Sequence, residues 1–222
     1  MSLQSLKTNW LRVAVHIGAW IPAGVMIWAA LTNQLGAEPI SEIILRTGKT
    51  ALVLLVLSLA CTPANTLLGF KPALKVRRAL GLYAFFYALA HLTMFVGVDY
   101  LFDVVLLADA ILEKPYALVG AAAFLVLLPL ALTSTKASMK RLGQTWNKLH
   151  RAVYLAAILV IVHFVWLVKL DVREPLIFGA SIAFLLALRI HFIRRFIAHW
   201  RGRIGNTLKP ARSNATKQSF HH

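Results

Sequence analysis

Three histidines occur in strongly apolar surroundings, where an ionisable side chain is functional by default. His91 and His163 each lie deep inside a long apolar segment, and His150 lies at the beginning of the segment that contains His163. A neutral imidazole binds transition metals, and two imidazoles on opposite sides of one iron ion are the protein ligands of a six-coordinate haem. The alternative for each of them is a hydrogen-bonded packing residue.

The composition indicates that the apolar segments span a membrane. Of the 222 residues, 59% are hydrophobic and 14% are charged, whereas a soluble domain has about 45–50% and about 25%. The 24 Lys and Arg exceed the 8 Asp and Glu, which gives a net charge of +16. These cations form short clusters between apolar runs, so they indicate membrane lipids rather than nucleic acid as the partner. The single cysteine, Cys61, excludes an intramolecular disulfide.

A helix needs about 20 mostly apolar residues to cross a bilayer, and six segments meet this requirement. Residues that break helices mark their limits, among them Gly69, Pro72, Pro115 and Pro175. The expected fold is therefore all-α, an integral membrane bundle of six transmembrane helices. The six segments are 13–31, 48–68, 79–98, 115–133, 150–168 and 175–193.

The spans are expected to form one domain. We expect residues 1–12 to be a cytoplasmic N-terminus, residues 13–199 to be the transmembrane domain, and residues 200–222 to be a basic, disordered cytoplasmic tail. The sequence shows no internal repeat. The connections are too short to contain an active site, so any chemistry must take place among the helices or on a partner.

Charge predicts the orientation. All eight acidic residues lie in or beside the first, third and fifth connections, whereas the second and fourth contain only basic ones. Lys and Arg in short loops resist translocation, which places both termini in the cytoplasm, in agreement with an even number of spans. The basic clusters are Lys71, Lys75, Arg77 and Arg78 in the second connection, and Lys136, Lys140, Arg141 and Lys148 in the fourth.

This orientation places His91 and His163 at the same depth in the membrane. At 1.5 Å per residue, each lies about 20 Å from the cytoplasmic end of its span, and the two spans run in the same direction. No carboxylate or thiolate lies at that depth, which disfavours zinc. His150 and His163 do not share one stripe of an ideal helix, so a kink, a bulge or different roles are expected. The aromatic residues expected around the pair include Tyr83, Tyr87 and Phe164.

A second candidate site lies at the cytoplasmic ends of the third and fifth spans. Cations beside aromatic rings suit a quinone head group, or the phosphate and isoalloxazine of FMN, because cations stabilise anionic reduced forms and phosphate. The alternative is a set of ordinary anchors in the lipid head groups. The residues expected to converge there are Arg77, Arg78, Lys148, His150 and Arg151, beside the aromatic rings of Trp146 and Tyr154.

The histidine pattern resembles the ferric-reductase-type transmembrane domain, with one histidine in the third span and two in the fifth. Within that superfamily, Arg77-Arg78-Ala79-Leu80-Gly81 and the stretch Trp146–Leu155 resemble the MsrQ family, also called YedZ. The resemblance extends from about residue 10 to residue 200, and we expect no attached flavin or nicotinamide domain.

The resemblance implies a haem b electron-transfer subunit of the bacterial inner membrane, not the catalytic subunit. Such proteins pass electrons from the quinone pool or a cytosolic flavin reductase to MsrP, a periplasmic molybdopterin reductase that repairs methionine sulfoxide in proteins. It implies His91 and His163 as haem ligands, His150 as the remaining family histidine or an alternative ligand, and FMN as a further cofactor. Oxidases with two haems have a histidine where this chain has Arg77, so a second bis-histidine haem is not supported.

Two other functions stay open. A free-standing ferric or other metalloreductase would work at the outer face, but the outer connections contain no histidine, cysteine or methionine cluster. A non-redox small transporter or structural membrane subunit would be favoured by charges deep in the spans, which are essentially lacking.

Overall fold

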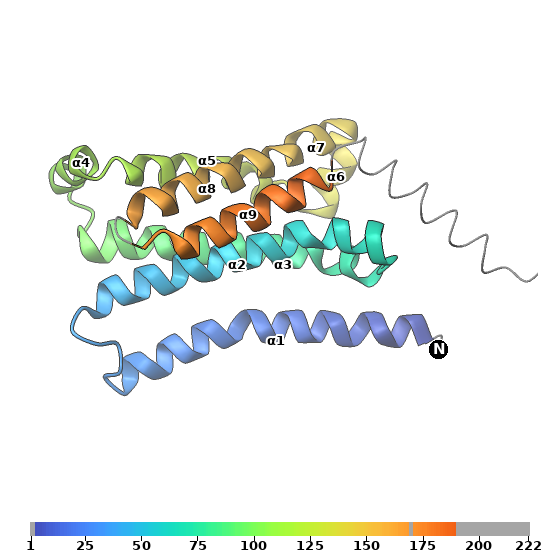
Figure 1. The fold of residues 1–222 in the computed structure, drawn as a ribbon, viewed down its shortest axis with the longest axis horizontal. Coiled ribbons are helices and arrows are strands. Elements are labelled where there is room, and N and C mark those ends of the chain that lie inside the picture. The colour runs from blue at the N-terminus through green and yellow to red at the C-terminus, as the bar shows by residue number, and fades with distance from the viewer. Residues whose placement is uncertain (1–2, 169–170, 190–222) are drawn as a thin grey trace, which may run out of the picture.

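The structure, a computed structural model, describes residues 3–168 and 171–189, and every regular element in these ranges is a helix (Figure 1). The long helices are α1 (Leu3–Leu31), α2 (Pro39–Leu68), α3 (Pro72–Thr93), α5 (Tyr116–Leu132), α8 (Val153–Leu167) and α9 (Arg173–Ala187). The short elements are the π-helix η1 (Met94–Asp99), α4 (Val104–Glu113), α6 (Lys136–Leu142), α7 (Gln144–Leu149) and the 3-10 turn η2 (His150–Ala152).

Local sequence signals set several helix ends. Pro39 and Pro72 stand at the first positions of α2 and α3, where the missing amide hydrogen costs nothing. After α2, Gly69 adopts a left-handed conformation with φ of 67°, and its amide donates to the carbonyl of Asn65. Asp103 caps α4 by accepting from two backbone amides.

Four helical stretches are long and apolar enough to cross a membrane, or five if α4 and α5 count as one broken span. The prediction of an all-α membrane bundle is therefore confirmed. For the sixth expected span, only the 15 residues of α9 are described, and residues 190–222 lie outside the described part. Six spans, and the expected tail at 200–222, remain predictions. The four stretches are Trp10–Leu31, Pro39–Leu68, Pro72–Asp99 and Gln144–Leu167.

Two parts of the structure differ from the expected boundaries. The helix α1 begins at Leu3, so most of the segment expected to precede the first span continues that helix. The third connection contains α4, which was not predicted and which is bent by 111° from α5. Its ten apolar-rich residues are too few to cross a bilayer, and the cap at Asp103 is a local signal that hydropathy does not detect.

Two antiparallel hairpins, α2 with α3 and α5 with α8, form the centre of the molecule (Figure 1). The helix α9 packs on α8 and α2, and α1 packs mainly on α3. The core contains Leu59 of α2 and Ala84 of α3, with Ala156 and Ala157 of α8 completely buried. The small side chains of the three alanines let the helix backbones approach closely.

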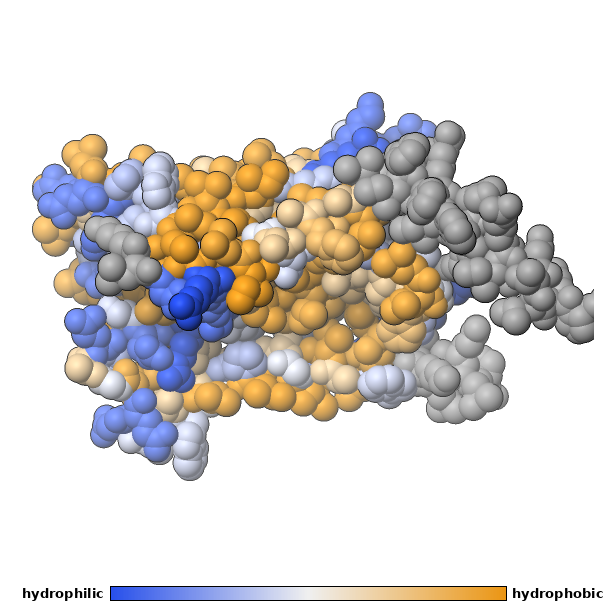
Figure 2. All heavy atoms as spheres, in the orientation of Figure 1, coloured by the Kyte–Doolittle hydropathy of each residue, from blue (hydrophilic) through white to orange (hydrophobic). Residues whose placement is uncertain are grey.

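The surface is that of a multi-pass membrane protein. Figure 2 shows hydrophobic residues across the middle of the molecule, with hydrophilic residues toward its two ends. Large apolar side chains on this surface are exposed, including Trp20, Trp28 and Leu155. Soluble monomers rarely expose apolar patches of that extent.

The connections alternate between the two ends of the bundle (Figure 1). We call the end with the α1–α2, η1–α5 and α8–α9 connections the acidic end, because all eight acidic residues lie in or beside them. The end with the α2–α3 and α5–α8 connections is called the basic end. At the acidic end, Lys49 forms an ion pair with Glu174, which joins α2 to α9. Which end faces the cytoplasm remains a prediction.

Candidate functional site

His91 of α3 and His163 of α8 face each other between the two hairpins. Their ring centroids are 6.2 Å apart, and the ring planes are inclined by 84°. The structure thus brings together the two histidines that were matched by depth in the sequence.

A backbone carbonyl of another helix holds each ring. The Nδ1 atom of His91 lies 2.8 Å from the carbonyl oxygen of Ile44, and that of His163 lies 2.7 Å from the carbonyl oxygen of Tyr116. A carbonyl oxygen only accepts hydrogen bonds, so Nδ1 carries the hydrogen in both rings. The lone pair of Nε2 is therefore free, which is the state that a metal ligand requires.

Two glycines make room for these contacts. A Cβ atom at Gly48 would lie 2.9 Å from Nδ1 of His91, and one at Gly120 would lie 2.8 Å from Nδ1 of His163. Each glycine stands one helical turn after the accepting carbonyl, so each imidazole rests directly on the helix backbone. Glycine inside a helix is less favourable than alanine by about 1 kcal/mol, and the close approach of the ring explains its presence.

The arrangement occurs twice at a constant interval. Positions 44, 48 and 91 of the first hairpin correspond to positions 116, 120 and 163 of the second, and both hydrogen bonds join residues 47 apart. The expectation of no internal repeat was wrong at the level of these contacts. It failed because only the residues that hold the rings recur, while most of their neighbours differ.

The spacing of the rings suits two ligands of one metal ion. With metal–nitrogen bonds of about 2 Å, the centroids of two imidazoles on opposite sides of a metal are about 6 Å apart, close to the observed 6.2 Å. Within the described residues, no group of three or more His, Cys, Asp and Glu side chains could hold a metal ion. A site with only two protein ligands suits a metal ion whose remaining coordination positions are filled by a macrocycle.

Tyr83 and Tyr87, expected around the pair, contact α1 instead. The Tyr87 hydroxyl donates to the carbonyl of Ala19 at 2.6 Å and accepts from the amide of Ala23 at 3.1 Å. The Tyr83 hydroxyl lies 2.7 Å from Nδ1 of His16. These contacts fix α1 on α3. The aromatic ring found next to His163 is that of Tyr116, with centroids 5.8 Å apart.

His150 lies at the basic end, where it contacts α7 and the end of α5. Its ring stacks on Trp146 with centroids 3.8 Å apart, and its Nε2 lies 3.1 Å from the hydroxyl of Thr133. The Thr133 hydroxyl donates to the carbonyl of Pro129 at 2.6 Å. It therefore accepts from His150, whose Nε2 carries the hydrogen. In this arrangement Nε2 of His150 is not available to a metal.

The 3-10 turn at His150–Ala152 accounts for the different directions of the two histidines near α8. A 3-10 turn has about three residues per turn instead of 3.6, so it shifts the helical phase between His150 and His163. Thr133 was missed in the sequence, because nothing in the local pattern shows that it meets a histidine 17 residues later.

The three arginines of the predicted quinone or flavin site have different surroundings. Arg77 is close enough to His150 for their charges to interact. Arg78 lines a pocket against α1, and Arg151 is exposed. A further cation near Arg77 was missed: Arg189 donates to the Tyr154 hydroxyl at 2.8 Å and to the carbonyl of Leu59 at 2.5 Å. Its signal in the sequence was a lone cation inside a predicted span.

Comparison with known proteins first defines the class. The family described as ferric reductase like transmembrane component matches residues 47–161. The matched range includes His91 and His150 and ends two residues before His163. The helical bundle and this match define a membrane protein with a ferric-reductase-like transmembrane domain.

Full-length relatives then identify the family. A protein of Xanthomonas axonopodis pv. citri (strain 306) is 41% identical over 185 residues, covering 81% of this chain and 85% of the relative. One of Herminiimonas arsenicoxydans is 42% identical over 183 residues, covering 81% and 84%. Both are named protein-methionine-sulfoxide reductase heme-binding subunit MsrQ. The chain belongs to the MsrQ family. No solved structure matches it.

Proposed function

We propose that the chain is a haem b electron-transfer subunit of a methionine sulfoxide reductase system, in which His91 and His163 would hold the haem iron. The facing pair carries this proposal, because both rings have Nδ1 bound to a carbonyl and are spaced for one metal ion. The relatives' name, heme-binding subunit, supports it.

A haem held by His91 and His163 would supply a reversible one-electron carrier. The chain's own residues orient the ligands and exclude water. The carbonyls of Ile44 and Tyr116 fix the two rings and increase the basicity of Nε2, as outer partners of metal-bound histidines do. The apolar helices around the pair keep the site dry, and they complete a domain that we place at residues 13–199 between the cytoplasmic segments 1–12 and 200–222.

We place the acidic end in the periplasm and the basic end in the cytoplasm of the bacterial inner membrane, with six spans in all. The histidine pair is then nearer the periplasmic face, since His91 is close to the end of α3. The proposed acceptor on that side is a periplasmic, MsrP-like molybdopterin reductase that repairs methionine sulfoxide.

The proposed electron donors act at the basic end. Quinol from the membrane or a cytosolic flavin reductase would deliver electrons near the stacked pair of Trp146 and His150. FMN is the further cofactor that we place here. The cations that would stabilise an anionic head group or phosphate are Arg77, Arg78 and Arg151.

The decisive experiment is the absorption spectrum of the purified protein before and after reduction with dithionite. We expect a Soret band that shifts on reduction, and its loss or conversion to high-spin haem in His91→Ala and His163→Ala. The control is His16→Ala, which removes an imidazole of α1 that contacts Tyr83. A wild-type protein without the band would refute the haem, and a full low-spin spectrum in either variant would refute the ligand pair.

A further inference from the structure

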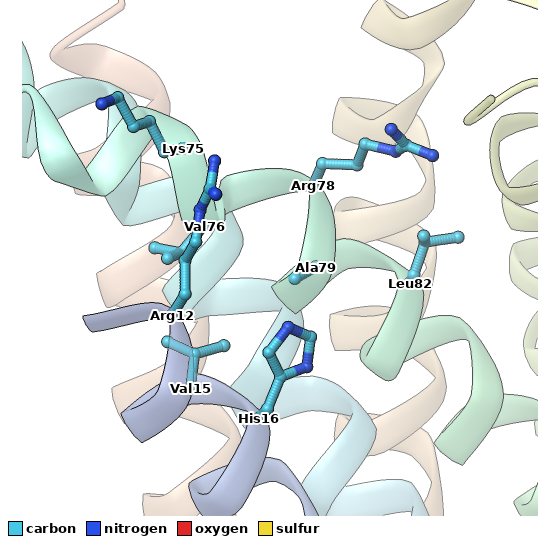
Figure 3. Close-up of a pocket in the computed structure, with 8 residues that line it drawn as sticks. All are labelled: Arg12, Val15, His16, Lys75, Val76, Arg78, Ala79 and Leu82. Atoms are coloured by element: carbon cyan, nitrogen blue, oxygen red, sulfur yellow. The ribbon is translucent and has the colours of Figure 1, made fainter. Parts of the chain in front are cut away.

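A pocket of about 300 Å³ lies between α1 and α3 at the basic end (Figure 3). This volume is at the lower limit of small-molecule sites, about 300–1,000 Å³, so it suits a head group rather than a whole lipid. The pocket is lined by Arg12, Val15 and His16 of α1 and by Lys75, Val76, Arg78, Ala79 and Leu82 of α3.

One of the lining residues, His16, also contacts Tyr83, with its Nδ1 atom 2.7 Å from the Tyr83 hydroxyl. Beyond this contact, Tyr87 fixes α1 to α3 through Ala19 and Ala23. The pocket thus occupies the stretch between that attachment and the basic end of the bundle. Its walls are apolar, because four of the eight lining residues are Val, Ala or Leu.

The charge of the pocket is of one sign. Arg12, Lys75 and Arg78 line it, and its lining residues include no Asp or Glu. The pocket therefore combines positively charged side chains with apolar ones.

Figure 3 shows how the polar groups are disposed. Arg12 and His16 point from α1 toward α3, with the imidazole directed at Ala79. Lys75 and Arg78 extend to opposite sides of the pocket. When the Tyr83 hydroxyl donates to Nδ1 of His16, Nε2 carries the hydrogen and can donate to an anion. The long side chain of Arg78 at the rim can place its charge beside a bound anion.

We propose that the α1–α3 pocket binds the phosphate group of an anionic phospholipid. The Arg12 guanidinium and the His16 ring donate to the phosphate from within the pocket, and Lys75 and Arg78 add charge at the rim. The glycerol and the start of an acyl chain lie along Val15, Val76 and Leu82. Arginine forks match phosphate oxygens, and basic pockets between membrane helices are typical sites for anionic lipid head groups.

A lipid in this position would contact both α1 and α3 and fill the space between them. Ordinary anchors contact head groups singly, whereas here residues of two helices line one pocket. This site is separate from the histidine pair, so it does not depend on the haem proposal.

The test uses the full-length protein in detergent micelles, titrated with dihexanoyl phosphatidylglycerol and followed by native mass spectrometry. Parallel titrations use dihexanoyl phosphatidylcholine and inorganic phosphate. We expect phosphatidylglycerol to bind, and to bind on the order of tenfold more weakly in Arg12→Gln, which removes a charge-assisted hydrogen bond. Ala79→Leu should weaken it similarly by filling the pocket. The control Lys140→Gln removes an exposed cation of α6 outside the pocket and should bind normally.

Equal affinity for phosphatidylglycerol in all four proteins would overturn the proposal. Phosphatidylcholine that binds as tightly as phosphatidylglycerol would also overturn it, because the net charge would then be irrelevant. Displacement of the lipid by inorganic phosphate at similar concentration would show that the site takes free phosphate instead. Arg12 is exposed, so its variant tests the idea even if Ala79→Leu fails to fold.

Discussion

The ring centroids of His91 and His163 are 6.2 Å apart, although the two residues belong to different hairpins and are 72 positions apart in the chain. Each ring is held within its own hairpin, the first by α2 and the second by α5. The two candidate ligands can therefore be disturbed independently, one hairpin at a time.

Gly48→Ala and Gly120→Ala should each weaken one ligand. The added methyl would overlap the imidazole of His91 or His163 and force the ring off its carbonyl. We expect partial conversion of low-spin to high-spin haem, or loss of haem, in the absorption spectrum. The matched control is Gly24→Ala in α1, where a Cβ meets nothing within 4 Å. An unchanged spectrum in both test variants would show that the glycines do not position the ligands.

Reporter fusions should establish the orientation. Fusions after Asp103 and Arg173 are expected to report the periplasm, and fusions after Lys75, Lys140 and Arg201 the cytoplasm, because basic clusters resist translocation. Alkaline phosphatase and green fluorescent protein give opposite readouts for the two sides. A periplasmic signal after Arg201 would contradict both the six spans and the proposed direction of electron flow.

His150 and Arg77 at the basic end should affect the rate at which electron donors reduce the haem, but not the binding of the haem. In His150→Ala and Arg77→Ala, we expect an intact haem spectrum and normal reduction by dithionite. Reduction by quinol or by reduced flavin should slow by about tenfold or more. Stopped-flow absorbance measures both rates. The comparison variant is Lys140→Ala, an exposed cation of α6 at the same end. Normal rates with both donors would place electron transfer from the donor elsewhere.

Tyr87→Phe should loosen α1. The hydroxyl makes two hydrogen bonds to the α1 backbone, and losing them should lower stability by about 1–3 kcal/mol. Thermal unfolding can be followed by labelling of Cys61, the single cysteine, which is buried. The control is Tyr116→Phe, whose hydroxyl makes no hydrogen bond in the described part of the chain. Equal unfolding temperatures in both variants would contradict this role.

Hydropathy and charge were sufficient to predict a helical membrane bundle and the depth of the two histidines. Both properties depend on position along a helix axis, which the sequence gives directly through the rise per residue. The direction of Tyr83 and Tyr87 could not be predicted in the same way. These residues face α1, and which helix packs on which face of α3 depends on the whole arrangement of the bundle.

The glycines of the candidate site show the same limit. Gly48 and Gly120 are ordinary small residues in an apolar sequence, and their role becomes visible only when a ring from another helix rests on each. The equal spacing of each glycine from its histidine was present in the sequence, but two matching intervals among 12 glycines and 8 histidines carry little weight without the contact.

The hydroxyl of Tyr87 has a consequence for the order in which the protein is assembled. It hydrogen-bonds the carbonyl of Ala19 and the amide of Ala23, which are four residues apart in α1. Tyr87 itself is synthesised 68 positions after Ala19. The first helix is therefore complete before its partner is synthesised, and Pro22 deprives it of one backbone hydrogen bond. Its docking is a late event in biogenesis, completed only after the ribosome has delivered the third helix.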